Sequence, residues 1–363
     1  MTRKSNLNIH IGTEKTGTTT IQNFLKANKE RLFKQSIYIS EDLMIPSGNQ
    51  RWLAAFAYNS TRIDELISTQ GYQSKEARDQ DIVDRYERFK NEVEASTGSC
   101  NQWIISSEHL QSRLTTEKEI NRLYELLKDL FKQITIILYI RNPVDAATSL
   151  MSMFCVYGDV LDQLPEPNNP HVKTICNHAK TLAKWQENFP KTKIKLRLFE
   201  KDRLSKGDLL KDFCEQAHIA PGSDWNLQTQ HSNERLTLKG MRYLYHLNSR
   251  FPPLINGNKN PERGNIAAYV QSFTKQAEPF QITLEQSQAY TEYYAESNEI
   301  IRSLYFPNQA TLWATKTRRY AHSTIKLSEI DGIDLTCLEM FAEAWATSQK
   351  QSQKINTIKR LIS

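Results

Sequence analysis

Two short segments of this chain combine residue types that bind anions. The first, Ile9 to Gln22, reads IHIGTEKTGTTTIQ and places Lys15 among two glycines and five threonines. Gly12 and Gly17 allow a turn tight enough for successive backbone N–H groups to converge on one point. A helix beginning near Thr18 would direct its unpaired N–H groups and its dipole to the same point. The pattern predicts a phosphate-binding loop.

The position of the lysine distinguishes this segment from a nucleoside-triphosphate loop. The consensus G-x-x-x-x-G-K-[ST] has its lysine directly after the second glycine and a hydroxyl on magnesium. Thr18 occupies that position here, and Lys15 lies inside the loop. We expect Lys15 to reach the bridging oxygen of a bound group from the side. The hydroxyls expected to reach a terminal phosphate are those of Thr16, Thr18, Thr19 and Thr20. The alternative is a glycine turn with a solvated lysine.

The second segment, RNPVDAATS, runs from Arg141 to Ser149 and directly follows the apolar stretch ITIILYI. We expect Arg141 at the carboxyl end of a central strand, the side on which open α/β sheets bind ligands. Asp145 and Ser149 are four residues apart and would share one face of a helix. Arg141 and Ser149 are therefore candidates to grip one phosphate. In the alternative interpretation, Arg141 is an ordinary charge at a strand exit and Ser149 a packing residue.

The surrounding elements would place both segments at the same edge of a sheet. The apolar runs predict an α/β fold, in which a P-loop-like parallel sheet is flanked by helices and followed by a helical C-terminal portion. We expect residues 1–230 to form the α/β core and residues 231–363 the helical portion packed on it, with no strand beyond about residue 221. Strands are predicted at residues 7–11, 36–40, 101–110, 134–140 and 193–200, and helices at 18–32, 117–133, 178–189, 234–251 and 284–306.

Composition narrows the class of protein. The chain has 363 residues and a formal net charge of +6, which fits an anionic ligand. Its Lys and Arg residues are spread along the sequence, so nucleic-acid binding is not inferred. Five widely spaced cysteines indicate a reducing compartment, the cytoplasm, and no apolar run is long enough to span a membrane. The sequence contains no acidic pair that would indicate a metal site. The spacing of four further residues does not suit a metal either, and we expect them at the surface or in packing: His171, Cys176, His178 and His231.

The two segments, in this order and spacing, closely resemble the sulfotransferases that use 3'-phosphoadenosine 5'-phosphosulfate (PAPS). In that family K-[ST]-G-T-[ST] binds the 5'-phosphosulfate and R-N-P-x-D-x-x-x-S the 3'-phosphate. Lys15 to Thr19 and Arg141 to Ser149 match these motifs, and the run HIGTEKTGTTTIQ is similar to a bacterial, carbohydrate-type branch. The resemblance spans roughly residues 7–307. It implies PAPS as cofactor, adenosine 3',5'-bisphosphate as product, no metal, and as cofactor-binding residues Gly12, Thr13, Lys15, Thr16, Gly17, Thr18, Thr19, Arg141 and Ser149.

The resemblance also implies a general base and an acceptor class. Relatives use a glutamate or a histidine where the third strand meets its loop, and this chain has both Glu108 and His109 in ISSEHL. Glu108 is favoured and His109 is second, and strand alternation would point them to opposite faces. Alternatively, one of them only orients the other or caps the following helix. The glycine-rich basic segment of phenol and steroid sulfotransferases is missing, and residues 231–235 are a candidate for adenine contacts.

Lys15 would stabilise the charge that develops on the departing phosphate oxygen, so it is expected to be catalytic. The expected reaction is in-line transfer of a sulfuryl group to a hydroxyl of a carbohydrate or glycolipid. Two alternatives remain open. A P-loop kinase would need a lysine directly after Gly17, and a non-catalytic nucleotide-binding protein on the same fold would bind PAPS without turnover. The sequence makes no prediction of the oligomeric state.

Overall fold

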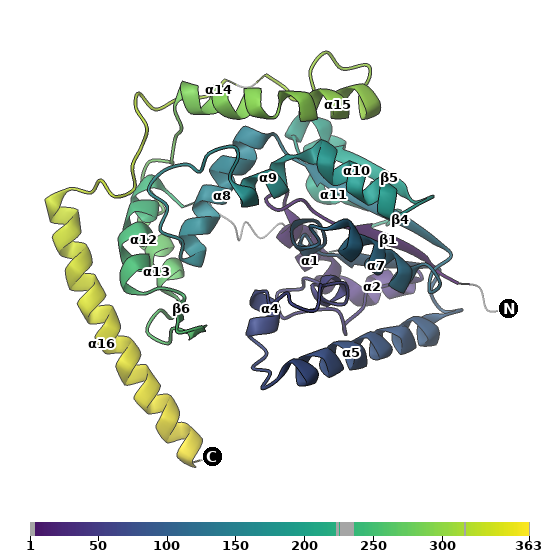
Figure 1. Cartoon of the computed structure of the whole chain (residues 1–363), viewed down its shortest axis with the longest axis horizontal. Coiled ribbons are helices and arrows are strands. Elements are labelled where there is room, and N and C mark those ends of the chain that lie inside the picture. Colours follow the sequence, from purple (N-terminus) through teal and green to yellow (C-terminus); the bar gives the residue numbers. More distant parts are fainter. Residues whose placement is uncertain (1–3, 223–224, 226–235, 316, 363) are drawn as a thin grey trace. The chain divides into compact units, whose positions relative to one another are not determined.

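A computed structural model describes residues 4–222, 225, 236–315 and 317–362 of the chain (Figure 1). The chain divides into two compact units, which are described separately. Unit 1 comprises Met1–Asn142, Lys173–Ser232 and Tyr294–Ala314. Unit 2 comprises Pro143–Val172, Asn233–Tyr293 and Thr315–Ser363. Each unit therefore takes segments from both sides of residue 230.

Unit 1 is built on a five-stranded sheet in which every pair of neighbouring strands is parallel. The strand order is β2-β3-β1-β4-β5, so β1 lies between β3 and β4. The predicted α/β class with a parallel sheet is confirmed, and all five predicted strands are present. Their bounds are β1 Asn6–His10, β2 Ile37–Tyr38, β3 Gln102–Ser106, β4 Gln133–Ile140 and β5 Lys193–Leu198.

Helices cover both faces of this sheet, as the unalternating apolar run of β4 predicts. On one face Ile137 and Tyr139 pack with Phe213 of α11, in a cluster that also includes α1 and α2. On the other face Ile136 and Leu138 belong to the cluster of α7 and α10. The helices of unit 1 are α1 Thr18–Ala27, α2 Lys29–Lys34, α3 Trp52–Ala55, α4 Glu65–Ser68, α5 Lys75–Ser96, α6 His109–Arg113, α7 Glu117–Leu127, α10 His178–Asn188, α11 Leu209–Ala217 and α15 Ala295–Tyr305.

The helix predicted over residues 18–32 is divided in two, which corrects the prediction. Asn28 separates α1 from α2 with φ −111° and ψ 18°, outside the helical region. Its side-chain Nδ2 donates to the carbonyl oxygen of Phe24 at 2.9 Å. The amide thus satisfies a carbonyl at the end of α1, as Asn side chains commonly do when they compete with helical hydrogen bonds.

Unit 2 is mainly helical but contains a two-stranded hairpin, which corrects the expectation of no strand beyond about residue 221. The strands β6 (Leu254–Ile255) and β7 (Asn258–Lys259) pair antiparallel across a two-residue turn. Asn256 and Gly257 have φ values of 52° and 79°, the conformation for which Asn-Gly is the preferred pair. The helices are α8 Pro143–Tyr157, α12 Leu238–Arg250, α13 Ile266–Thr274, α14 Leu284–Tyr293 and α16 Gly332–Ile362, and α9, Pro170–Cys176, contains the boundary between the units.

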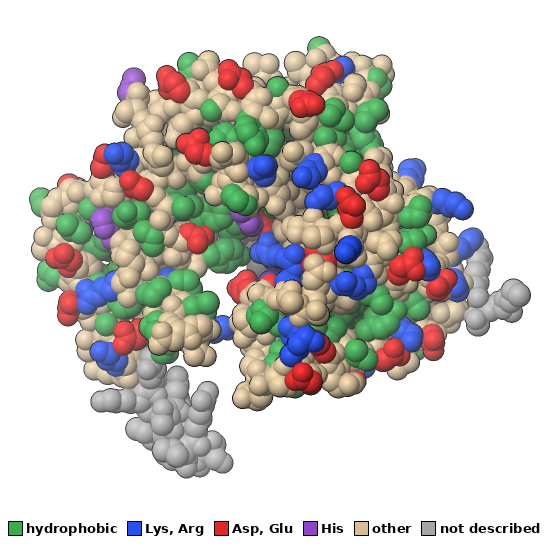
Figure 2. All heavy atoms as spheres, viewed as in Figure 1, with side chains coloured by type: hydrophobic (Ala, Val, Ile, Leu, Met, Phe, Trp, Pro, Cys, Tyr) green, Lys and Arg blue, Asp and Glu red, His purple; other side chains and the backbone are tan. Residues whose placement is uncertain are grey.

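Basic and acidic side chains are interspersed on the face of the molecule drawn in Figure 2. Within the part of the chain that the structure describes, no helix is both long and apolar enough to cross a membrane.

Candidate functional site

The carboxyl ends of β3, β1 and β4 meet at one edge of the sheet, and backbone hydrogen bonds tie their exits together. The N–H of Thr13 donates to the carbonyl oxygen of Tyr139 at 2.7 Å, and the N–H of Tyr139 donates to the carbonyl oxygen of Gly12 at 2.8 Å. On the opposite side, the N–H of Ser107 donates to the carbonyl oxygen of His10 at 2.9 Å. The loop from Gly12 to Gly17, called the anion loop below, therefore begins as a continuation of the sheet.

The loop itself is wound by three residues with positive φ. These are Gly12 at 97°, Lys15 at 65° and Gly17 at 78°. The hydroxyl of Thr16 donates to the carbonyl oxygen of Thr13 at 2.6 Å, so it braces the loop from within. Thr13 and Thr16 are fully buried, whereas Lys15 is partly exposed at the tip.

Helix α1 begins at Thr18, as predicted, with Gly17 in the position before it. Gly17 has no side chain, and no capping side chain hydrogen-bonds the first turn. The first N–H groups of a helix have no partner within the helix, so they are donors for an anion at this end. Thr19 and Thr20 lie half-buried in the same first turn. The predicted loop and helix N-terminus are present. The hydroxyl of Thr16 is bonded within the loop, and contact of Thr18, Thr19 and Thr20 with a phosphate stays a prediction.

Gly12 lies directly against Glu108. A Cβ atom added to Gly12 would lie 2.9 Å from Cβ and 3.0 Å from Cα of Glu108. The loop and the candidate base are therefore in van der Waals contact, and no side chain larger than hydrogen fits between them.

We expect Gly12→Ala to lower the free energy of unfolding by more than the backbone strain alone. Left-handed backbone costs a residue with a Cβ about 1–2 kcal/mol, and the contact with Glu108 adds about 1–3 kcal/mol of overpacking. Gly71→Ala is the matched control, because Gly71 also has a positive φ, 72°, but no atom within 4 Å of the added Cβ. Urea unfolding measures both variants. Equal losses of stability would contradict the close contact.

The carboxylate of Glu108 is hydrogen-bonded by two amides. Nε2 of Gln22 and Nδ2 of Asn49 donate to its Oε2 atom at 2.7 Å and 2.9 Å. Burial raises the pKa of Glu108, the hydrogen bond from Gln22 opposes that rise, and the charge of Glu14 adds to it. A buried carboxyl group with a raised pKa is a stronger base once it has lost its proton.

Two expectations about Glu108 and His109 are changed by the local geometry. Strand β3 ends at Ser106 and α6 begins at His109, so strand alternation does not govern where the two side chains point. Glu108 precedes α6, but its side chain makes no capping hydrogen bond, which removes helix capping as an account of this residue.

His109 is a weak base in this setting. Burial, together with the positive charges of Arg51 and Arg113, lowers its pKa to about 3. Its Nδ1 atom is buried and has no hydrogen-bond partner among the described residues. The two arginines are themselves paired, Arg51 with Asp64 at 2.9 Å and Arg113 with Glu14 at 3.2 Å. His109 is therefore neutral near pH 7.

Arg141 is joined to the loop. Its Nη1 group donates to the carbonyl oxygen of Lys15 at 2.7 Å, and its guanidinium lies 5.5 Å from the ring centre of Phe199. Nε2 of His178 hydrogen-bonds the carbonyl oxygen of Arg141 at 2.8 Å. Burial lowers the pKa of His178 to about 4, so this imidazole is a neutral donor. The first segment and the start of the second thus meet, and His178 holds the backbone of Arg141 by a hydrogen bond.

Ser149 and Asp145 belong to unit 2 and lie on one helix, α8, as predicted. Ser149 is buried. Asp145 pairs with Arg318 of the same unit at 2.8 Å. The joint grip of Arg141 and Ser149 on one phosphate stays a prediction.

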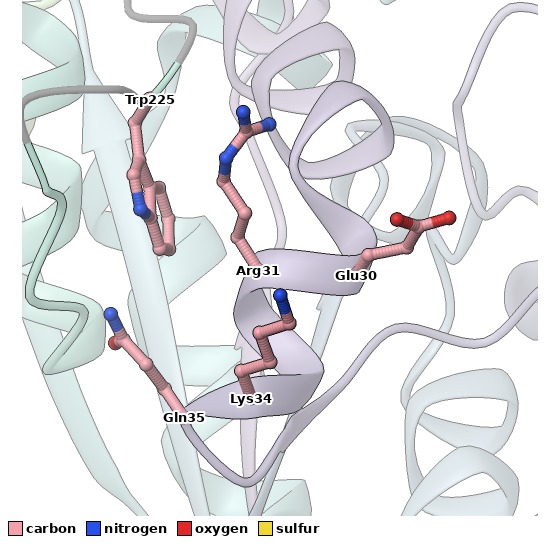
Figure 3. Close-up of a pocket in the computed structure, with 5 residues that line it drawn as sticks. All are labelled: Glu30, Arg31, Lys34, Gln35 and Trp225. Carbon is pink, nitrogen blue, oxygen red and sulfur yellow. The ribbon is translucent and has the colours of Figure 1, made fainter.

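A pocket of about 400 Å³ lies elsewhere in unit 1 (Figure 3). Arg31 and Lys34 of α2 extend toward the space beside the Trp225 ring, and Glu30 points away from it. The side-chain amide of Gln35 donates to the carbonyl oxygen of Ala220 at 2.6 Å and accepts from the N–H of Ala220 at 3.2 Å. None of the predicted site residues lines this pocket. It is not the candidate active site.

Over the described residues, no group of three or more His, Cys, Asp or Glu side chains is arranged to hold a metal ion. His171 is half-buried, and Cys176 and His178 are buried. Within the described part of the chain, no disulfide joins the cysteines, of which four are buried and Cys337 is exposed. His231 and the candidate adenine contacts at residues 231–235 lie outside the described residues.

Comparison with known proteins shows a similarity to solved structures. No protein-family model matches the chain, and no curated protein matches it. Among solved structures, the chain is similar to the crystal structure of a sulfotransferase from Alicyclobacillus acidocaldarius, with 18% sequence identity and a TM-score of 0.38. The similarity covers 69% of this chain and 92% of that chain.

Proposed function

We propose that this chain is a PAPS-dependent sulfotransferase that moves a sulfuryl group to a hydroxyl of a carbohydrate or glycolipid. One observation carries the proposal: the loop that bears Lys15 contacts both Arg141 and Glu108 at one edge of the sheet. A donor for the leaving group, a cation for a phosphate and a base for the acceptor are thus supplied by three adjacent strand exits.

The residues present fit the anionic half of PAPS. Gly12 and Gly17 both have positive φ, and a Cβ at either position would clash with a neighbour, at 2.9 Å from Glu108 and 2.4 Å from Leu209, so this tightly wound loop requires glycine at both positions. We assign the 5'-phosphosulfate to the loop and to the first turn of α1, and the 3'-phosphate to Arg141 with Ser149. When bound, PAPS supplies the sulfuryl group and a leaving phosphate oxygen.

In the proposed mechanism Lys15 stabilises the negative charge that develops on that leaving oxygen. A sulfuryl group carries less charge than a terminal phosphoryl group, so fixed donors are sufficient without magnesium. Glu108 accepts the proton of the acceptor hydroxyl. Its raised pKa makes it a stronger base than His109, whose pKa is lowered to about 3. We therefore assign Glu108 as the base and His109 as its neighbour.

Calorimetric titration with adenosine 3',5'-bisphosphate tests the proposal. The parent protein is expected to bind with micromolar affinity, and Arg141→Ala is expected to weaken binding by about 2 kcal/mol, the scale of a lost charge-assisted contact. That loss corresponds to about 30-fold in Kd. Arg88→Ala on α5 is the matched control and is expected to leave the affinity unchanged. Arg88 is exposed, and its ion pair with Asp42 is long, 3.8 Å.

An unchanged affinity in Arg141→Ala would remove the second segment from the binding site. Magnesium-dependent binding of ATP in preference to the bisphosphate would instead support the P-loop kinase. Nucleotide binding without transfer of ³⁵S to any of a panel of sugars and lipids would support a non-catalytic protein on the same fold. A cytoplasmic location and the absence of nucleic-acid partners are part of the proposal and rest on composition.

A further inference from the structure

The carboxylate of Glu108 is held by amide side chains from two separate elements. Gln22 belongs to α1 and Asn49 to the segment between β2 and α3, and both amide nitrogens donate to the same oxygen, Oε2. Both amide residues are only 3% exposed. Two buried donors converging from different directions fix the position and the rotation of a carboxylate.

Helix α1 connects this carboxylate to the anion loop. Thr18 and Gln22 are four residues apart and share one face of α1. The Thr18 hydroxyl also hydrogen-bonds Glu108, so two successive turns of α1 contact the same carboxyl group. Because α1 begins directly after Gly17, the helix that receives the anion also sets the distance from that anion to Glu108.

We propose that Gln22 and Asn49 are positioning residues, which hold Glu108 in the orientation needed to accept a proton from the acceptor hydroxyl. This inference rests on the proposed sulfuryl transfer. Neither amide touches the reacting atoms; each acts through Glu108.

No charged donor in the described segments pairs with Glu108, so its hydrogen bonds come from neutral side chains, those of Gln22, Asn49 and Thr18. Glu14 in the loop repels the ionised carboxylate, and Arg113 of α6 is paired with Glu14. His109 is neutral, and Arg51 is paired with Asp64. A hydrogen bond to the ionised form lowers the pKa of a carboxyl group, so removal of an amide donor raises it further.

Titration of Glu108 by NMR tests the contact without any need for turnover. With carboxyl-¹³C glutamate, the Glu108 resonance is assigned as the one missing from Glu108→Gln. Gln22→Met and Asn49→Leu keep the approximate size of each side chain and remove the donor. Each variant is expected to raise the pKa of Glu108 by about one pH unit, the value of one hydrogen bond to a charged group.

Asn23→Leu is the matched control, because Asn23 follows Gln22 on α1 but lies on another face of the helix, and no pKa shift is expected from it. If Gln22→Met does not fold, Gln22→Asn replaces it, since the shorter side chain keeps its amide but loses the contact. An unchanged titration of Glu108 in both donor variants would overturn the proposal.

The rate measurement separates this inference from the proposed function. In the active enzyme, kcat/KM falls at low pH as Glu108 becomes protonated. In both variants the pH midpoint of this fall is expected to rise together with the pKa of Glu108 measured by NMR. A purely structural loss would instead lower the rate at every pH and leave the midpoint of this acid limb in place. A limb that stays in place would overturn the positioning role. If the NMR value shifts but the parent transfers no sulfuryl group to any acceptor, the proposed function is refuted and the hydrogen bonds from Gln22 and Asn49 are confirmed.

Discussion

Lys15→Ala is expected to lower kcat by about 100-fold or more, the cost of removing one donor that acts on transition-state charge. The lysine lies at the tip of a loop whose root is tied into the sheet, so its ammonium is presented from a fixed backbone. Because the charge on the leaving oxygen is greatest in the transition state, affinity for adenosine 3',5'-bisphosphate is expected to fall much less than kcat. Single-turnover ³⁵S transfer and calorimetry measure the two quantities.

Two further variants sharpen this test. Lys15→Arg keeps the positive charge but replaces a compact ammonium with a planar fork, so it is expected to restore only part of the rate. Lys118→Ala on α7 removes an exposed lysine of the same unit and is expected to leave kcat unchanged. A Lys15→Ala enzyme with the turnover of the parent would show that the loop lysine has no part in the chemistry.

Glu108→Gln is expected to lower kcat by about 10²- to 10⁴-fold, the range for a general base. The amide cannot accept a proton from the acceptor, although its size still fits against Gly12. The parent should lose activity as pH falls through the raised pKa of Glu108, because protonation destroys the base. This acid limb should be missing from the residual activity of Glu108→Gln, as stopped assays across pH will show.

His109→Asn provides the comparison for that result. Burial lowers the pKa of His109 to about 3, so its protonation state does not change across the working pH range and its loss is expected to leave the acid limb in place. If instead the limb disappears in His109→Asn and persists in Glu108→Gln, the assignment of base and neighbour must be exchanged.

The sheet was predictable because each of its strands is a short apolar run between polar segments. The uninterrupted run of β4 also predicted burial on both faces, and Ile136, Ile137 and Leu138 are fully buried. The division at Asn28 and the hairpin at Asn256–Gly257 were missed for a different reason. Both depend on one or two residues whose local conformation overrides the surrounding pattern, although the Asn-Gly pair is itself a recognisable hairpin signal.

The candidate site was only half predictable. The anion loop and Arg141 were found because their residues are contiguous and lie next to strands. The supports of Glu108 and Arg141 were not, since Gln22 and Asn49 are 86 and 59 residues from Glu108, and His178 is 37 residues from Arg141. A buried amide or imidazole carries no pattern of its own in a single sequence, and only folding brings such groups beside the residues that they hold.

The hydrogen bonds that join Gly12 and Thr13 to Tyr139 have a consequence for how this region can move. Tyr139 is a fully buried residue of a central strand, so the start of the loop shares the mechanical stability of the protein interior. If the loop binds an anion as proposed, any adjustment of its backbone is confined to the few residues between Thr13 and Thr18, while the start of the loop keeps its position on the sheet.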